Sequence, residues 1–156
     1  MKKVCGTILL VIVLTISASA TADDIRFGRI TIEQGLSQNS VSCILQDTRG
    51  FMWFGTMEGL NKYDGYSFTH YLHTPENPTG ISDSQINAIC EDRSEVLWIG
   101  TSGGLNRLNR KSERFVHYRY DSQNAQSLSH DNVRTISEDK SGILWIGTGR
   151  GLNLSA

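Results

Sequence analysis

The sequence lacks the features that mark nucleic-acid-binding and membrane-spanning proteins. Lysine and arginine total 15 and aspartate and glutamate total 16, so the net charge is −1, and no basic stripe is present. After residue 22, no apolar run approaches the roughly 20 residues needed to cross a bilayer. Helical periodicity of useful length is missing as well. These absences argue against nucleic-acid binding, against a membrane span within 23–156, and against a helical fold.

Patterns for catalysis or metal binding are also missing. The four histidines include no pair with zinc-like spacing and a third ligand, and the acids form no dense loop of the kind that calcium needs. No nucleophile elbow can be recognised, and no helix follows the glycines near "GTSGGL" and "GTGRGL" to cradle a phosphate. We therefore expect no catalytic residue, no cofactor and no metal site in this chain.

Cysteine is scarce, with three residues in the chain. Cys5 lies in the N-terminal apolar region, whereas Cys43 and Cys90 lie inside strand-like runs and lack metal-ligand spacing. An exported protein could pair the last two in a disulfide. Free cysteines also pack like small hydrophobic side chains, and this is the favoured interpretation of Cys43 and Cys90.

The N-terminus has the three-part pattern of a secretory signal peptide. Lys2 and Lys3 precede the uncharged apolar run "VCGTILLVIVLTI", and small residues follow, with Ala20 and Ala22 at the −3 and −1 positions. This pattern predicts a signal peptide over residues 1–22 with cleavage after Ala22. An uncleaved N-terminal anchor is the alternative, although the apolar run is short for a bilayer span.

The sequence does contain one five-residue motif that occurs three times. "LWIGT" occurs at 97–101 and at 144–148, and "MWFGT" occurs at 52–56. The tryptophans of successive copies are 45 and 47 residues apart, and an acid stands six residues before each of them. A repeat of this period indicates a repeat architecture such as a propeller or a solenoid.

Within each repeat the local signals are those of short strands. "SVSCILQ" and "FMWFGT" are rich in β-formers and bounded by turn residues. "DTRG" and "DKSG" fit hairpin turns, whereas Glu95 replaces the glycine in the middle copy, where we expect a strained turn or a different turn type. A third strand follows at "GLNKYD" and "GLNRLN", and a fourth at 66–73 and 113–120.

Four antiparallel strands in about 45 residues are typical of a β-propeller blade. We therefore predict an all-β fold of propeller blades, with 36–73 as the first blade, 81–120 as the second and 128–156 as a truncated third. Residues 26–32 are predicted to form a fourth strand that has no three strands before it. We expect this orphan strand to close the ring by completing the last blade. Because a closed propeller needs at least four blades, residues 23–156 are expected to form a partial propeller with an incomplete ring.

Residues that are identical in all copies are assigned to the scaffold. The tryptophans are expected to pack between blades, the glycines to allow close backbone approach, and the acids to open the turns. These structural positions are Trp53, Trp98, Trp145, Gly55, Gly100, Gly147, Asp47, Asp92 and Asp139.

Binding residues are sought where the copies differ, since a shared scaffold explains agreement. The linkers 74–80 and 121–127 vary, and so do the two positions before the second glycine of each copy. The candidate ligand-binding residues at those positions are Met57, Glu58, Ser102, Gly103, Gly149 and Arg150.

The repeated units resemble the two-component-regulator propeller repeat over about 36–153. Members of that family are exported β-propellers that form the periplasmic sensor of receptors, which continue into a transmembrane helix and a histidine kinase or diguanylate cyclase. The resemblance implies that this chain is the N-terminal fragment of such a receptor, located in the periplasm and non-catalytic.

The resemblance also implies the partners of this chain. They are an unknown small-molecule or oligosaccharide-type ligand and the remainder of the receptor. Contact with a membrane is expected only through that remainder or an uncleaved N-terminal segment. Two alternatives stay open: an exported propeller enzyme such as a lyase, which needs a paired acid and base on one face, and a structural or adhesive repeat protein.

Overall fold

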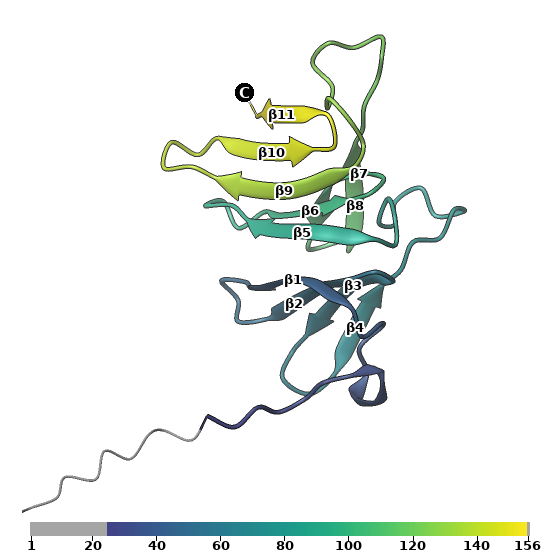
Figure 1. Ribbon diagram of the computed structural model, residues 1–156, viewed down its shortest axis with the longest axis vertical. Coiled ribbons are helices and arrows are strands. Elements are labelled where there is room, and N and C mark those ends of the chain that lie inside the picture. Colours follow the sequence, from purple (N-terminus) through teal and green to yellow (C-terminus); the bar gives the residue numbers. More distant parts are fainter. Residues whose placement is uncertain (1–24, 156) are drawn as a thin grey trace, which may run out of the picture.

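The computed structural model describes residues 25–155, which form three antiparallel β-sheets and one short 3-10 helix (Figure 1). The predicted signal peptide, residues 1–22, lies outside the described residues. In each sheet the strands follow one another in chain order, and every neighbouring pair is antiparallel. The prediction of an all-β fold built from four-stranded antiparallel units is thereby confirmed.

The first two sheets have four strands each, and the third has three within the described residues. The strands of the first sheet are β1 (Val41–Gln46), β2 (Met52–Thr56), β3 (Gly59–Tyr63) and β4 (Phe68–Tyr71). Those of the second are β5 (Ile86–Glu91), β6 (Leu97–Thr101), β7 (Gly104–Asn109) and β8 (Arg114–Tyr118). Those of the third are β9 (Val133–Glu138), β10 (Leu144–Thr148) and β11 (Gly151–Leu154).

The sheets stack face to face and approach most closely at their first strands, so that β5 lies between β1 and β9 (Figure 1). Glycine allows this approach. A Cβ atom added to Gly55 would lie 2.7 Å from Cγ2 of Ile86, and one added to Gly100 would lie 2.6 Å from Cγ1 of Val133. Such distances are too short for any side chain larger than a hydrogen atom.

Farther from the first strands, large side chains fill a wider gap between the sheets. Tyr71 of β4 and Phe115 of β8 meet edge to face with ring centroids 5.6 Å apart. Small residues at the inner strands and aromatic residues at the outer strands give each sheet a wedge-shaped contact with the next. A stack of wedges curves around an axis, as propeller blades do.

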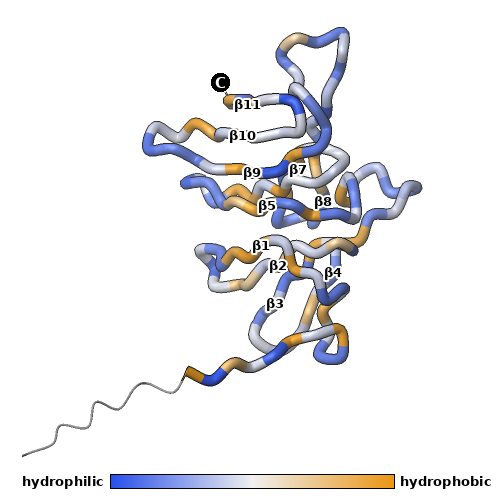
Figure 2. The backbone as a smooth tube through the Cα atoms, in the orientation of Figure 1, coloured by the Kyte–Doolittle hydropathy of each residue, from blue (hydrophilic) through white to orange (hydrophobic). Residues whose placement is uncertain are grey.

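Two hydrophobic cores lie between the sheets. The first includes Trp53 and Leu60 from the first sheet and Ile86 and Ile99 from the second, all nearly or completely buried. The second joins residues of the second and third sheets around Val133. Figure 2 shows hydrophobic residues recurring along the strands and hydrophilic residues dominating the turns and linkers.

The segment predicted as an orphan closing strand, 26–32, is not a strand in the described structure. Residues 26–31 have no regular secondary structure, and Ile32 begins the 3-10 helix η1 (Ile32–Gln34), which Thr31 and Gln34 close with a capping box. Phe27 is 91% exposed. A strand needs a hydrogen-bonded neighbour, and none of the three sheets supplies one to this segment. Its pairing with a last blade stays a prediction.

The turn at Glu95 has the same geometry as its glycine-containing counterparts. Glu95 has a φ of 59°, against 87° for both Gly50 and Gly142. The amide of Glu95 donates to the carbonyl of Asp92, as that of Gly50 does to Asp47. Of the two expectations for this turn, the structure therefore favours strain over a different turn type, since residues other than glycine rarely adopt a positive φ.

Candidate functional site

The six candidate binding residues lie in three two-residue turns at one edge of the sheets. These turns connect β2 to β3, β6 to β7, and β10 to β11. Met57, Glu58, Gly149 and Arg150 are exposed, and Ser102 and Gly103 are half-buried. Backbone hydrogen bonds tie the turns to the loops that precede the first strands, for example from Ser102 to Gln85 and from Gly149 to Asn132. We call this edge the turn face.

A buried polar network supports each turn. In the second sheet, Asn106 is completely buried; its Oδ1 accepts from the amide of Ser82 at 3.0 Å, and its Nδ2 donates to Oγ of Ser82 at 2.9 Å and to the carbonyl of Ile99 at 3.2 Å. The hydroxyl of Thr101 lies 2.8 Å from Oγ of Ser82 and donates to the carbonyl of Gly104. Each network thus joins the linker before a sheet to that sheet's own second hairpin.

The same network occurs in all three sheets. In the first it comprises Ser37, Thr56 and Asn61, and in the third Ser129, Thr148 and Asn153. Our scaffold assignment missed these nine residues. The signal was available, because serine, threonine and asparagine recur at matching positions in every copy of the repeat.

The repeated acids and tryptophans lie at the opposite edge of the sheets. Nε1 of Trp53 donates to Oδ2 of Asp47 at 2.8 Å, while Oδ1 of Asp47 accepts from the amides of Arg49 and Phe51. The second and third repeats make the same indole bond, between Trp98 and Asp92 at 2.8 Å and between Trp145 and Asp139 at 2.9 Å. Each acid therefore both orders its turn and satisfies a neighbouring indole.

The tryptophans become more exposed along the stack. Trp53 is 1% exposed, Trp98 is half-buried and Trp145 is 36% exposed. Trp53 and Trp98 pack in the hydrophobic cores that the first and second sheets share with the next sheet, whereas no described sheet follows Trp145. The repeated glycines Gly55 and Gly100 lie on the same faces, at the close contacts described above, and Gly147 is the equivalent residue of the third sheet.

A clamp of charged residues joins the first two sheets at this edge. Nη1 of Arg110 lies 2.6 Å from Oδ2 of Asp47, and Nη2 lies 2.5 Å from Oε1 of Glu91. Glu91 also accepts from the amide and hydroxyl of Thr48 at 2.8 and 3.0 Å. Sequence analysis did not find Arg110, because Gly65 stands at the equivalent position of the first repeat.

The clamp shifts the ionisation of Asp47. Burial alone raises the pKa of this carboxyl group, but the hydrogen bonds from Trp53, Phe51 and Arg110 together with the charge of Arg110 outweigh burial, so that the pKa is lowered from 3.8. Asp47 is therefore an anion at neutral pH, and its charge is matched by the guanidinium group.

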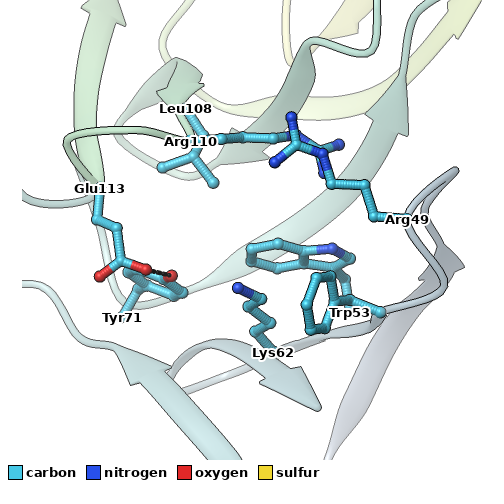
Figure 3. Close-up of a pocket in the computed structure, with 8 residues that line it drawn as sticks. Arg49, Trp53, Lys62, Tyr71, Leu108, Arg110 and Glu113 are labelled. Carbon is cyan, nitrogen blue, oxygen red and sulfur yellow. Dashed lines mark hydrogen bonds between the residues drawn. The ribbon is translucent and has the colours of Figure 1, made fainter. Parts of the chain in front are cut away.

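A small cavity lies beside the clamp, between the first and second sheets (Figure 3). Its volume of about 30 Å³ has room for a water-sized guest and not for an organic ligand. The hydroxyl of Tyr71 donates to Oε1 of Glu113 at 3.1 Å at one side, and burial and this carboxylate raise the pKa of Tyr71. The lining residues are Arg49, Phe51, Trp53, Lys62, Tyr71, Leu108, Arg110 and Glu113. None of the six candidate binding residues is among them.

Neither cysteine of the described chain is in a disulfide. Cys43 and Cys90 are free and half-buried, and they pack against the first and second hydrophobic cores. Burial raises the pKa of both thiols, which disfavours the reactive thiolate. Among residues 25–155, no group of three or more histidine, cysteine, aspartate or glutamate side chains is arranged to hold a metal ion. No helix in that range is long and apolar enough to span a membrane.

Antiparallel sheets that approach at their first strands, each with the same indole–carboxylate pair and the same buried network, are blades of a β-propeller. The family model for the two component regulator propeller matches residues 35–58, 80–103 and 127–150. The chain therefore carries three repeats of this family.

Known proteins that resemble the chain include a histidine kinase and two extracellular domains. Histidine kinase P4 of Formosa agariphila is 43% identical over 73 residues, which are 47% of this chain and 5% of the kinase. The extracellular domain of a Bacteroides thetaiotaomicron protein described as a hybrid two component system is 37% identical, with a TM-score of 0.76 over 81% of this chain. A second such domain from the same organism, described as a one component system, is 30% identical, with a TM-score of 0.66 over 80% of this chain. The chain spans 18% of each of these two structures.

Proposed function

We propose that the chain is the N-terminal part of the sensor propeller of an exported two-component receptor, and that it binds a ligand without catalysing a reaction. Three family repeats, a relative that is a histidine kinase and similar structures that are extracellular domains support this role. The proposal places the propeller in the periplasm, after cleavage of the signal peptide, with the remainder of the receptor as its partner.

One observation carries the binding role. At the turn face, the three copies of the buried network are identical, while the side chains that they present differ completely. The first turn presents Met57 and Glu58, the second Ser102 and Gly103, and the third Gly149 and Arg150. Loops that vary on a constant scaffold are where proteins place recognition.

The chemistry of these turns suits a polar ligand. Glu58 and Arg150 carry opposite charges and are exposed, and Met57 adds an apolar side chain that is 43% exposed. Carboxylate and guanidinium groups form strong hydrogen bonds with hydroxyl-rich or charged molecules. A small polar molecule or an oligosaccharide therefore fits this face better than an extended apolar ligand does.

The proposal is tested by titrating soluble oligosaccharides and small polar metabolites against the protein, with isothermal calorimetry as the readout. A ligand found in this way is then titrated against Glu58→Gln and Arg150→Gln, where we expect affinity to fall about tenfold, or about 1.4 kcal/mol. Lys140→Gln is the matched control, because Lys140 lies exposed in the β9–β10 turn at the opposite edge.

Equal affinity of both turn-face variants and the control would contradict a site at the turn face. Conversion of the ligand into a product during the titration would overturn the non-catalytic assignment.

A further inference from the structure

The outer face of the third sheet has the side chains that the first and second sheets use to bind the sheet after them. The first and third sheets form the two ends of the stack, with the second between them (Figure 1). Trp53 is 1% exposed, whereas Trp145, at the same position of the third sheet, is 36% exposed. Leu105 is 5% exposed, whereas its counterpart Leu152 is 61% exposed. The third sheet therefore presents one half of an interface between sheets.

The outer face of the first sheet presents the other half. Val133 and Ile136 of β9 pack against the second sheet and are 0% and 9% exposed. Val41 and Ile44 occupy the same positions of β1 and are 38% and 61% exposed. The first sheet thus carries the apolar residues that fit against a preceding sheet, and no described sheet covers them.

The shapes of the two outer faces also match. Between the second and third sheets, Gly100 leaves the space that Val133 fills. Gly147 is the equivalent of that glycine on the outer face of the third sheet, and Val41 is the equivalent of that valine on the outer face of the first. The same close contact can therefore form between the two ends.

A polar contact between sheets has counterparts at the ends as well. The amide of Arg93 in the second sheet donates to Oε2 of Glu138 in the third at 3.0 Å. The first two sheets have the equivalent bond. Lys140 and Gln46 stand at the corresponding positions of the two ends. Oε1 of Gln46 is an acceptor of the kind that this amide needs.

We propose that the outer face of the third sheet binds the outer face of the first sheet in a second copy of this chain, head to tail. Such a contact joins two different surfaces, so it closes into a ring where the rotation allows and otherwise extends the array. Two copies of three sheets each bring six sheets together, within the range of about four to eight blades of a propeller. The contact does not use the turn face, so this proposal is independent of the sensing role.

The test places a charge on one face at a time. Ile44→Asp alters the first sheet and Leu152→Asp alters the third, and both side chains are 61% exposed, so neither change disturbs a core. We expect the wild-type chain, without residues 1–22, to elute as an oligomer in size-exclusion chromatography with light scattering. Each variant alone should be monomeric at the same concentration, with a dissociation constant raised at least about tenfold, because an unpaired carboxylate is costly to bury.

An equimolar mixture of the two variants should restore one contact. The unaltered third sheet of Ile44→Asp then binds the unaltered first sheet of Leu152→Asp, which gives a heterodimer at concentrations where each variant alone is monomeric. Val116→Asp is the matched control, because Val116 is an apolar residue of β8 in the middle sheet that is 43% exposed. This variant should associate as the wild type does.

Cooperative urea unfolding of each variant shows that it is folded, and Val41→Asp, on the same face, replaces Ile44→Asp if that variant is not. A monomeric wild type would overturn the proposal. Association of either variant alone would also overturn it, since the copies would then meet through like faces. A mixture that stays monomeric would show that the two outer faces do not bind each other.

Discussion

At the residue scale, Glu95 is in a conformation that favours glycine. Its φ is 59°, and the two equivalent turns have glycine there. We predict that Glu95→Gly stabilises the protein by about 0.5–1 kcal/mol, because relief of left-handed strain of about 1–2 kcal/mol exceeds the added entropy of the unfolded chain. Urea unfolding measures the change. Glu95→Ala keeps the strain and should bring no gain; a gain as large as that of glycine would contradict this explanation.

Asp47 makes the junction between the first two blades sensitive to acid. Its pKa in the folded state is below the ordinary value of 3.8, so its contribution to stability is complete above that pH and is lost as pH falls through the folded pKa. We predict that Asp47→Asn loses about 3 kcal/mol at neutral pH, because Arg110 stays buried with one partner fewer.

The same variant should also lose less stability than the wild type as pH falls below about 4, since it lacks the carboxylate whose folded pKa is lowered. Unfolding curves across this range measure both effects. Parallel pH profiles of variant and wild type would show that Asp47 does not contribute.

Two tryptophans at equivalent positions should contribute differently to stability, because they are buried to different extents. Trp53→Ala should cost about 3–5 kcal/mol, because the indole is 1% exposed in the first core. Trp145→Ala should cost about 1 kcal/mol, because the same indole position is 36% exposed in the third blade. Equal losses of stability for the two variants, in thermal or urea unfolding, would show that burial of the indole does not determine how much it stabilises the protein.

At the scale of elements, the buried network holds the linker and the second hairpin of each blade together. Asn106→Ala removes the acceptor for Ser82 and two of the donor bonds, and we predict a loss of about 2–3 kcal/mol. Hydrogen exchange should become faster at the amide of Ser82. Asn153→Ala breaks the same bonds in a half-buried site and should cost less. A loss at Asn153 equal to that at Asn106 would mean that burial does not determine the strength of the network.

The strands could be predicted because the sequence patterns that indicate them are local and occur in all three repeats. Alternation, turn residues and recurring glycines indicated the four-stranded units, and comparison of the copies separated the scaffold from the variable turns. The clamp at Arg110 could not be found in this way, since it joins residues far apart in the chain and the first repeat has Gly65 in place of the arginine. The prediction of a strand at 26–32 rested on local sequence, and a strand forms only when a partner lies beside it.

At the scale of the whole molecule, both ends of the stack expose apolar faces. Val41 and Ile44 are 38% and 61% exposed on the first sheet, and Trp145, Leu152 and Leu154 are 36%, 61% and 55% exposed on the third. We predict that a polypeptide limited to residues 23–156 associates in solution, because such faces and strand edges pair with other chains. Size-exclusion chromatography at several concentrations measures this. A monodisperse monomer that unfolds cooperatively would contradict it.

The buried network that holds each turn closes within a single blade, from the linker to the hairpin of the same repeat. New residues in one turn therefore need no compensating change in the neighbouring blades. Duplication and recombination of whole repeats can then vary the turn residues at little risk to folding. Such an architecture lets proteins built from these repeats diverge quickly in the residues of the turn face.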